Sequence, residues 1–225
     1  MSVEAHITSK LEAGLQVMDL NINPEQLEQL AAYVVLIEKW NKVHNLTAIR
    51  DPLEMVTLHI LDSLSVLKIL AEQNPKYVLD VGAGAGLPSI PLAICLPEIN
   101  FTAIDAVQKK ASFMRQAKAE LGLSNFSVEA GRVEQLKKEK FNQGLGVDVI
   151  ISRAFSEVTL FVKLTQSLLA EKGRWFAMKG LVPHEELENA EFKKLGVLVE
   201  KVAPLFVPAL DAERHLVVLK EKLIN

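Results

Sequence analysis

Apolar residues recur at helical spacing in the first 70 residues of the chain. One amphipathic series runs along Leu27, Leu30, Ala31, Val34 and Ile37. It follows Asn23–Gln26 (NPEQ), which resembles a capping box with proline at the first helical position. Asp51–Glu54 (DPLE) repeats this start signal before a segment to Leu70 that is apolar on almost every side. These patterns predict a helical N-terminal part.

The pattern changes after Pro75, where short apolar runs begin to alternate with segments of helical spacing. The apolar runs are YVLDV (77–81), FTAID (101–105), FSVEA (126–130), VDVIIS (147–152) and RWFAMK (174–179). The helical segments are PSIPLAICL (88–96), QKKASFMRQAKAEL (108–121), RVEQLKKEK (132–140), EVTLFVKLTQSLLA (157–170) and HEELENAEFKKL (184–195). Five such units predict an open, mostly parallel sheet with helices on both faces.

The last segment, residues 196–220, has apolar runs with no helical segment between them. It predicts two final strands that pair antiparallel. The whole chain is therefore expected to be an α/β protein with a seven-stranded sheet. The change of pattern predicts an N-terminal helical extension over residues 1–74, packed on a core over residues 75–225.

Composition narrows the class of protein. Hydrophobic residues make up 49% and charged residues 24% of the chain, which is typical of a folded globular protein. The net charge of −3 argues against indiscriminate binding of nucleic acid, although a local basic face is compatible with it. Because Cys95 is the only cysteine, an internal disulfide and a multi-cysteine zinc cluster are excluded, and we expect no metal site.

No segment resembles a targeting or membrane-spanning sequence. The first 20 residues carry several charges and lack the continuous apolar region of a signal peptide. The longest uncharged apolar run, residues 87–97, contains three prolines and is too short to span a bilayer. We therefore expect a cytoplasmic protein without membrane contact.

Three glycines at alternate positions follow the first apolar run: Gly82, Gly84 and Gly86 in VLDVGAGAGLPSIPLA (78–93). A plain strand-to-helix turn would also use glycine, because turns need positive φ. However, such a loop lets a ligand approach the bare backbone at a helix N-terminus. Asp105 ends the second apolar run, nineteen residues after Gly86, where an acid can accept hydrogen bonds from a ribose diol. Glycines and acid together predict a ribose-bearing cofactor.

Two residues beside the loop distinguish between cofactors. The dinucleotide fingerprint requires glycine at position 87, and Leu87 stands there, which disfavours NAD and FAD. Asp80 ends the run just before the loop and would repel a pyrophosphate, whereas it suits the sulfonium and ammonium groups of S-adenosylmethionine. The series D-x-G-x-G-x-G followed by a distant acid resembles the signature of class I, Rossmann-like methyltransferases.

Other residues limit the methyl acceptor. Cys95 lies in an apolar helical segment, which is typical of an inert core thiol and argues against covalent catalysis on a pyrimidine. The fourth run ends in ISRAF (151–155) and lacks the Asn-Pro-Pro-aromatic loop of many amino-group methyltransferases. The remaining acceptors have their own lone pair: a guanine N7, an oxygen or a small amine. Guanine N7 carries no proton, so its methylation needs no general base.

The chain as a whole resembles the bacterial small-subunit ribosomal RNA guanine-N7 methyltransferases, also called the glucose-inhibited division protein B family. The similar segments are KWNKVHNLTAIRDPLEMVTLHILDSL (39–64), LDVGAGAGLPSIPLA (79–93), GRVE (131–134), ISRAF (151–155), MKG (178–180) and PALDAERHLVVLK (208–220). The resemblance implies methylation of guanine N7 in 16S ribosomal RNA, free or within the small subunit, with S-adenosylmethionine as cofactor. We expect a monomer.

The resemblance also implies roles for individual residues. Gly82 and Leu87 would line the methionine end of the cofactor, and Val133 and Glu134 would flank its adenine. Arg153 would lie beside the cofactor near the target base, as the candidate catalytic residue. The segments Asn45–Thr47 and His59–Ser63 would pack the helical part over the mouth of the site. The candidates for RNA contact are Arg174, Lys179, Arg214 and His215.

At three positions the chain departs from the family pattern. Ala83 stands where a hydroxyl residue is frequent, and Ser89 where glycine is frequent. Both are small, so cofactor binding should survive. Ala212 replaces a usual glycine in the final hairpin, which argues against a positive φ at that position.

Two alternatives remain at the level of sequence. The protein could methylate a small molecule, with the helical N-terminal part as a substrate lid. It could also be an RNA-binding assembly factor that keeps the cofactor fold without turnover.

Overall fold

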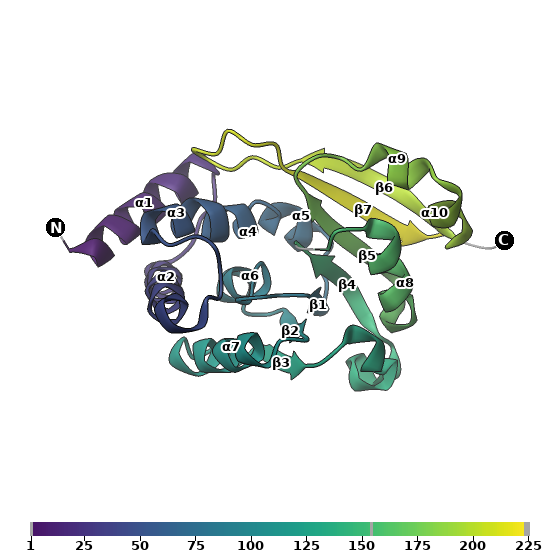
Figure 1. Ribbon diagram of the computed structural model, residues 1–225, viewed down its shortest axis with the longest axis horizontal. Coiled ribbons are helices and arrows are strands. Elements are labelled where there is room, and N and C mark those ends of the chain that lie inside the picture. The colour runs from purple at the N-terminus through teal and green to yellow at the C-terminus, as the bar shows by residue number, and fades with distance from the viewer. Residues whose placement is uncertain (1, 154, 223–225) are drawn as a thin grey trace.

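A seven-stranded sheet in the order β3-β2-β1-β4-β5-β7-β6 forms the centre of the computed structural model (Figure 1). The structure describes residues 2–153 and 155–222; Met1, residues 223–225 and Ala154 of the ISRAF segment lie outside the described residues. The strands are β1 (Tyr77–Val81), β2 (Asn100–Asp105), β3 (Phe126–Ala130), β4 (Val147–Ser152), β5 (Leu169–Lys179), β6 (Val197–Pro204) and β7 (His215–Glu221). Strands β1 to β5 pair in parallel, and β7 pairs antiparallel with both β5 and β6. The predicted fold class, including the final antiparallel pair, is confirmed.

Helices cover both faces of this sheet (Figure 1). The N-terminal helical elements are α1 (Val3–Val17), α2 (Pro24–His44), α3 (Pro52–Met55), the π-helical turn η1 (Val56–Leu61), α4 (Asp62–Leu64) and α5 (Leu67–Glu72). They share one face with α6 (Ser89–Cys95) and α7 (Gln108–Glu120). The other face carries α8 (Val158–Thr165), α9 (His184–Glu188) and α10 (Ala190–Lys194). None of the helices in the described residues is long and apolar enough to cross a membrane.

The N-terminal helices begin where their start signals predict. The Asn23 side chain accepts a hydrogen bond from the Gln26 amide at 2.8 Å, and the Gln26 side chain accepts one from the Asn23 amide at 2.9 Å, which confirms the capping box. Asp51 caps the second start by accepting from the Leu53 amide at 2.9 Å. The segment after Asp51 is not one regular helix, because η1 interrupts it.

Three predicted helices differ in the structure. Residues 132–140 form only the 3₁₀ turns η2 (Val133–Gln135) and η3 (Lys138–Lys140), because their apolar residues, Val133 and Leu136, are too few to give a helix an apolar face. Strand β5 begins at Leu169, so the helix predicted to reach Ala170 ends at Thr165. The segment 184–195 breaks at Asn189, whose side chain caps α10.

The loop between β6 and β7 contains one strained residue. Ala212 is not among the described residues with positive φ, as expected, but Ala209 has a φ of +58°. The loop is anchored by Leu205 and Val207, which are buried against the N-terminal helices.

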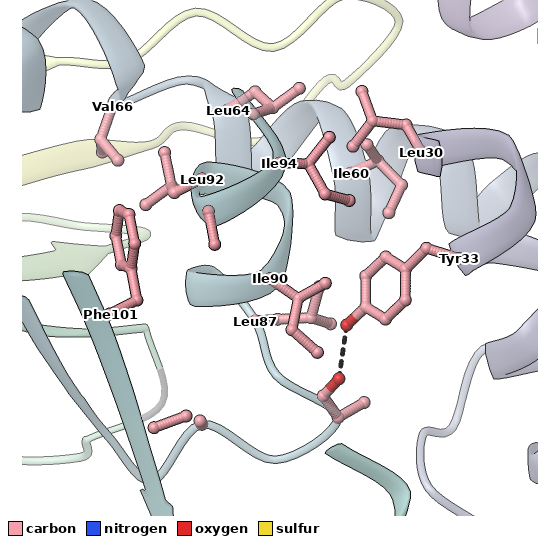
Figure 2. Packing of buried hydrophobic residues seen from close by; sticks show 14 of the residues in the cluster. Leu30, Tyr33, Ile60, Leu64, Val66, Leu87, Ile90, Leu92, Ile94 and Phe101 are labelled. Carbon is pink, nitrogen blue, oxygen red and sulfur yellow. Dashed lines mark hydrogen bonds between the residues drawn. The ribbon is translucent and has the colours of Figure 1, made fainter. Parts of the chain in front are cut away.

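The helical N-terminal part and the sheet share one buried cluster (Figure 2). In it, Ile90 of α6 lies between the N-terminal helices and the sheet, and Tyr33 of α2 reaches the glycine loop. The buried Tyr33 hydroxyl donates a hydrogen bond to the carbonyl oxygen of Ala85. The helical part therefore holds the loop directly, while the domain boundary at residue 74 stays a prediction.

We expect Tyr33→Phe to lower the free energy of unfolding by about 1–2 kcal/mol, because it leaves the Ala85 carbonyl without this buried donor. Urea unfolding followed by circular dichroism measures the effect. The control is Tyr77→Phe, since the Tyr77 hydroxyl makes no hydrogen bond within the described part of the chain. Equal stabilities of the two variants would contradict the assignment.

Candidate active site

The glycine loop joins the carboxyl end of β1 to α6, and its three glycines have φ values of +71° (Gly82), +61° (Gly84) and +87° (Gly86). A Cβ built on Gly82 or Gly84 would meet no atom within 4 Å. A Cβ on Gly86 would lie 2.3 Å from Cδ1 of Ile90. The first two glycines therefore leave open space over bare backbone, and the third is required for packing against α6.

Asp105, at the end of β2, holds the loop from the neighbouring strand. Its Oδ2 accepts a hydrogen bond from the Gly84 amide at 2.9 Å, and its Oδ1 accepts one from the Val107 amide at 2.8 Å. The ammonium group of Lys110 lies 4.0 Å from Oδ2. Each carboxylate oxygen keeps a further lone pair, so the side chain can still accept hydrogen bonds from a ribose diol.

A cavity of about 320 Å³ opens beside this carboxylate. Four of the predicted cofactor residues line it: Gly82, Asp105, Val133 and Glu134. Its apolar lining includes Phe155, Leu160 and Leu164, which the sequence patterns did not identify as site residues. The i, i+4 spacing of Leu160 and Leu164 predicts that both lie on one face of α8. The spacing does not show whether that face packs in the core or lines a cavity, so the sequence could not assign them to the site.

The other predicted cofactor residues lie outside the lining of this cavity. Gly84 and Gly86 shape the loop, and Leu87 is buried beneath it. Asp80 is fully buried, and its Oδ2 accepts a hydrogen bond from the Ser89 amide at 3.1 Å. Asp80 Oδ1 has no partner among the described residues. Burial raises the pKa of the Asp80 carboxyl to about 7, an effect that the Ser89 hydrogen bonds only partly oppose.

These features fit the expected S-adenosylmethionine. Bare backbone at Gly82 and Gly84 leaves room for the methionine part, and Asp105 provides a ribose acceptor. The unpartnered oxygen of Asp80 lies behind the loop, where a nearby cation would stabilise its ionised form.

A second cavity, of about 430 Å³, lies at the ends of the next strands. Arg153 follows β4, Lys179 ends β5 and Arg214 precedes β7, so three neighbouring strands bring their side chains to it. His215 is beside it, with Nδ1 2.7 Å from the Gly180 carbonyl oxygen. Phe155 lines the first cavity and Arg153 the second, so two residues that follow β4 closely contribute to different cavities.

A family comparison identifies the chain. The model of the family described as GidB, rRNA small subunit methyltransferase G, matches residues 26–217. The chain belongs to this family. The ribosomal RNA small subunit methyltransferase G of Methylobacillus flagellatus is 57% identical over 93% of this chain and 96% of its own length. The protein of the same name from Cupriavidus pinatubonensis is 47% identical over 95% of this chain and 93% of its own.

Solved structures support the fold of this methyltransferase family member. A SAM-dependent methyltransferase from Aquifex aeolicus superposes with a TM-score of 0.54 at 19% identity, over 74% of this chain and 92% of its own. The TYW2 protein of M. jannaschii in complex with AdoMet gives a TM-score of 0.52 at 19% identity, over 72% and 77% of the chains. At these identities the similarity concerns the fold alone.

Arg174 is the predicted RNA-contact residue that the structure does not bring to the second cavity. It precedes Lys179 by five residues and lies in the middle of β5, which places it roughly 16 Å from the strand's carboxyl end. Its guanidinium group pairs with Glu200, with Nε 2.9 Å from Oε2. The sequence shows only that Arg174 and Lys179 are both cationic. The strand places Lys179 at the second cavity and Arg174 away from it.

Two further side chains are uncharged at neutral pH: His59, which lines the second cavity, and Cys95, which ends α6. Burial, with a smaller contribution from the nearby charge of Arg153, lowers the pKa of His59 to about 4. The His59 Nε2 lies 2.9 Å from Thr47 Oγ1. Burial raises the pKa of the Cys95 thiol to about 12, so it is no nucleophile at neutral pH. Within residues 2–153 and 155–222, no three His, Cys, Asp or Glu side chains form a group that could hold a metal ion.

We expect Gly84→Ala to weaken S-adenosylmethionine binding by about tenfold or more, because its methyl group would occupy the space left for the ligand. The control is Gly122→Ala, where φ is +67° and a Cβ also meets nothing within 4 Å. Both variants should lose about 1 kcal/mol of stability from the positive φ, but only Gly84→Ala should lose affinity in calorimetry. Equal affinities would show that the open space is not a binding site.

Cofactor affinity should rise with pH through about 7, the pKa of Asp80. Below this pH the carboxyl is protonated, and a bound cation must displace that proton; above it the carboxylate is already ionised. Titrations between about pH 5.5 and 7.5 avoid deprotonation of the ligand's own amine. Asp80→Asn should remove the slope, and identical slopes in both proteins would refute the linkage.

Proposed function

We propose that this protein transfers the methyl group of S-adenosylmethionine to N7 of a guanine in the small subunit's 16S ribosomal RNA. The observation that carries the proposal is the pair of cavities to which Phe155 and Arg153 contribute after β4. One offers a ribose acceptor and an apolar wall, and the other is lined by three cationic side chains. The printed names of the relatives, rRNA small subunit methyltransferases, support RNA as the substrate.

S-adenosylmethionine supplies an electrophilic methyl group on a positively charged sulfur. Asp105 would accept hydrogen bonds from the ribose, and Val133 and Glu134 would flank the adenine. Arg153, which lines the second cavity, would orient the acceptor base. The protein thus acts mainly by holding the two reactants in line, which is the principal requirement of this transfer.

The weak basicity of His59 and the protonated thiol of Cys95 are compatible with a methyl acceptor that has no proton to lose. His59 is neutral near pH 7, and its ring nitrogens lie within hydrogen-bonding distance of Thr47 Oγ1 and the Leu58 carbonyl oxygen. The Cys95 thiol is protonated and lies in α6. Guanine N7 needs neither a general base nor a covalent nucleophile, so both groups are compatible with it.

RNA would approach over Lys179, Arg214 and His215, at the rim of the second cavity. Because ribosomal RNA is the substrate, we place the protein in the cytoplasm.

The test is transfer of tritium from labelled S-adenosylmethionine to small ribosomal subunits and to 16S RNA that lack the modification. Label in RNA, with strand cleavage at a single guanine after borohydride and aniline treatment, is the expected result. Label only in small metabolites would favour a small-molecule methyltransferase. Cofactor binding without any transfer would favour an assembly factor.

If Lys179 contacts a phosphate, Lys179→Met should reduce the salt dependence of RNA binding by about one unit of log–log slope. The control is Lys172→Met, because Lys172 lies seven residues before Lys179 on β5 and does not line the second cavity. Filter binding at several salt concentrations gives both slopes. An unchanged slope for Lys179→Met would remove this residue from the RNA surface.

A further inference from the structure

The second cavity contains an ion cluster that joins three distant parts of the chain. Asp62 Oδ2 lies 3.0 Å from Nη1 of Arg153, and Asp62 Oδ1 lies 2.9 Å from Nε of Arg214. The Asp62 side chain is only 5% exposed, whereas the arginine side chains are 22% and 26% exposed. One buried carboxylate therefore holds two guanidinium groups at the cavity wall.

The backbone next to Asp62 contributes to the same arrangement. In a regular α-helix the Asp62 amide would donate to the Leu58 carbonyl. In the π-helical turn it donates to Thr57 and His59, and the Leu58 carbonyl oxygen accepts a hydrogen bond from Arg153 Nη1 at 3.0 Å. Single π-helical turns inside helices occur frequently at functional sites. The widened turn thus presents two acceptors to one guanidinium group.

Charge explains why this carboxylate matters for the reaction. Among the described residues that line the cavity, Asp62 is the only acid beside Arg153, Lys179 and Arg214. Transfer to N7 moves a positive charge from sulfur to the purine ring. An unscreened guanidinium next to the ring would oppose that movement, and two unscreened arginines would repel each other. Asp62 reduces both effects.

We propose that Asp62 is a positioning residue, which fixes and screens Arg153 and Arg214 at the acceptor cavity through the π-helical turn of the N-terminal helices. This inference rests on the proposed function, and it adds a residue and a role to the site. The acceptor side of the site is then built partly by the helical N-terminal part and not by the sheet alone.

The variant Asp62→Asn tests the proposal, because its shape is nearly unchanged but its amide group would face a guanidinium donor. The kcat for RNA methylation should fall by roughly tenfold to a hundredfold through displacement of Arg153. The affinity for S-adenosylmethionine should stay within about twofold, because Asp62 does not line the cofactor cavity. A crystal structure of the variant should show Arg153 moved from the Leu58 carbonyl.

The control variant is Lys10→Met. The Lys10 ammonium donates to the Leu53 carbonyl at 2.7 Å, so its loss weakens the same group of helices without touching either arginine. Lys10→Met should keep kcat at a temperature at which it is folded. Equal losses of kcat in both variants, a normal kcat in Asp62→Asn, or an unmoved Arg153 would each overturn the proposal. If the wild-type protein methylates no RNA, the proposed function fails, while the position of Arg153 still tests the role of Asp62.

Discussion

The carboxylate of Asp105 fixes the backbone on which the rest of the site depends. By accepting from the amides of Gly84 and Val107, it ties the loop after β1 to the turn after β2. The amides of Gly82 and Ala83 also donate to the Ile104 carbonyl oxygen, at 2.9 and 3.2 Å, so β2 anchors the loop through its backbone as well as through this side chain. Because this carboxylate is also the proposed ribose acceptor, the shape of the loop and the binding of the ribose would depend on the same side chain.

The N-terminal helices complete both halves of the site. Tyr33 donates to the loop carbonyl at Ala85, on the cofactor side, and Asp62 holds two arginines on the acceptor side. The connection is a continuous apolar cluster through α6, which Figure 2 shows between the two layers. A displacement of these helices would therefore affect cofactor loop and acceptor cavity together. This coupling argues against treating the helical part as a detachable lid.

Sequence patterns were sufficient for the fold and for the cofactor loop. Strand runs and glycines at alternate positions are local signals, and they correctly predicted the sheet, the loop and the place of Asp105 at a strand end. The prediction of a helix over residues 132–140 was wrong. The charged residues there are compatible with a helix, but the segment has too few apolar residues to form the buried face that a packed helix needs. The hydrogen bonds of Asp62 to Arg153 and Arg214 join residues separated by 91 and 152 positions, so no local pattern contains them.

The distribution of charge explains how a protein with a net charge of −3 can present a surface to RNA. Lys179, Arg153 and Arg214 come from three strand ends and converge on one cavity, while Arg174, in the middle of β5, is paired with Glu200 away from that cavity. In physiological salt, the effect of a surface carboxylate on the potential at the cavity is largely screened when the two are more than about 8 Å apart. Local potential, and not net charge, therefore controls the approach of a phosphate. The one acid among the described residues that line the cavity, Asp62, is nearly buried, so it orders the arginines while their outer edges still face solvent.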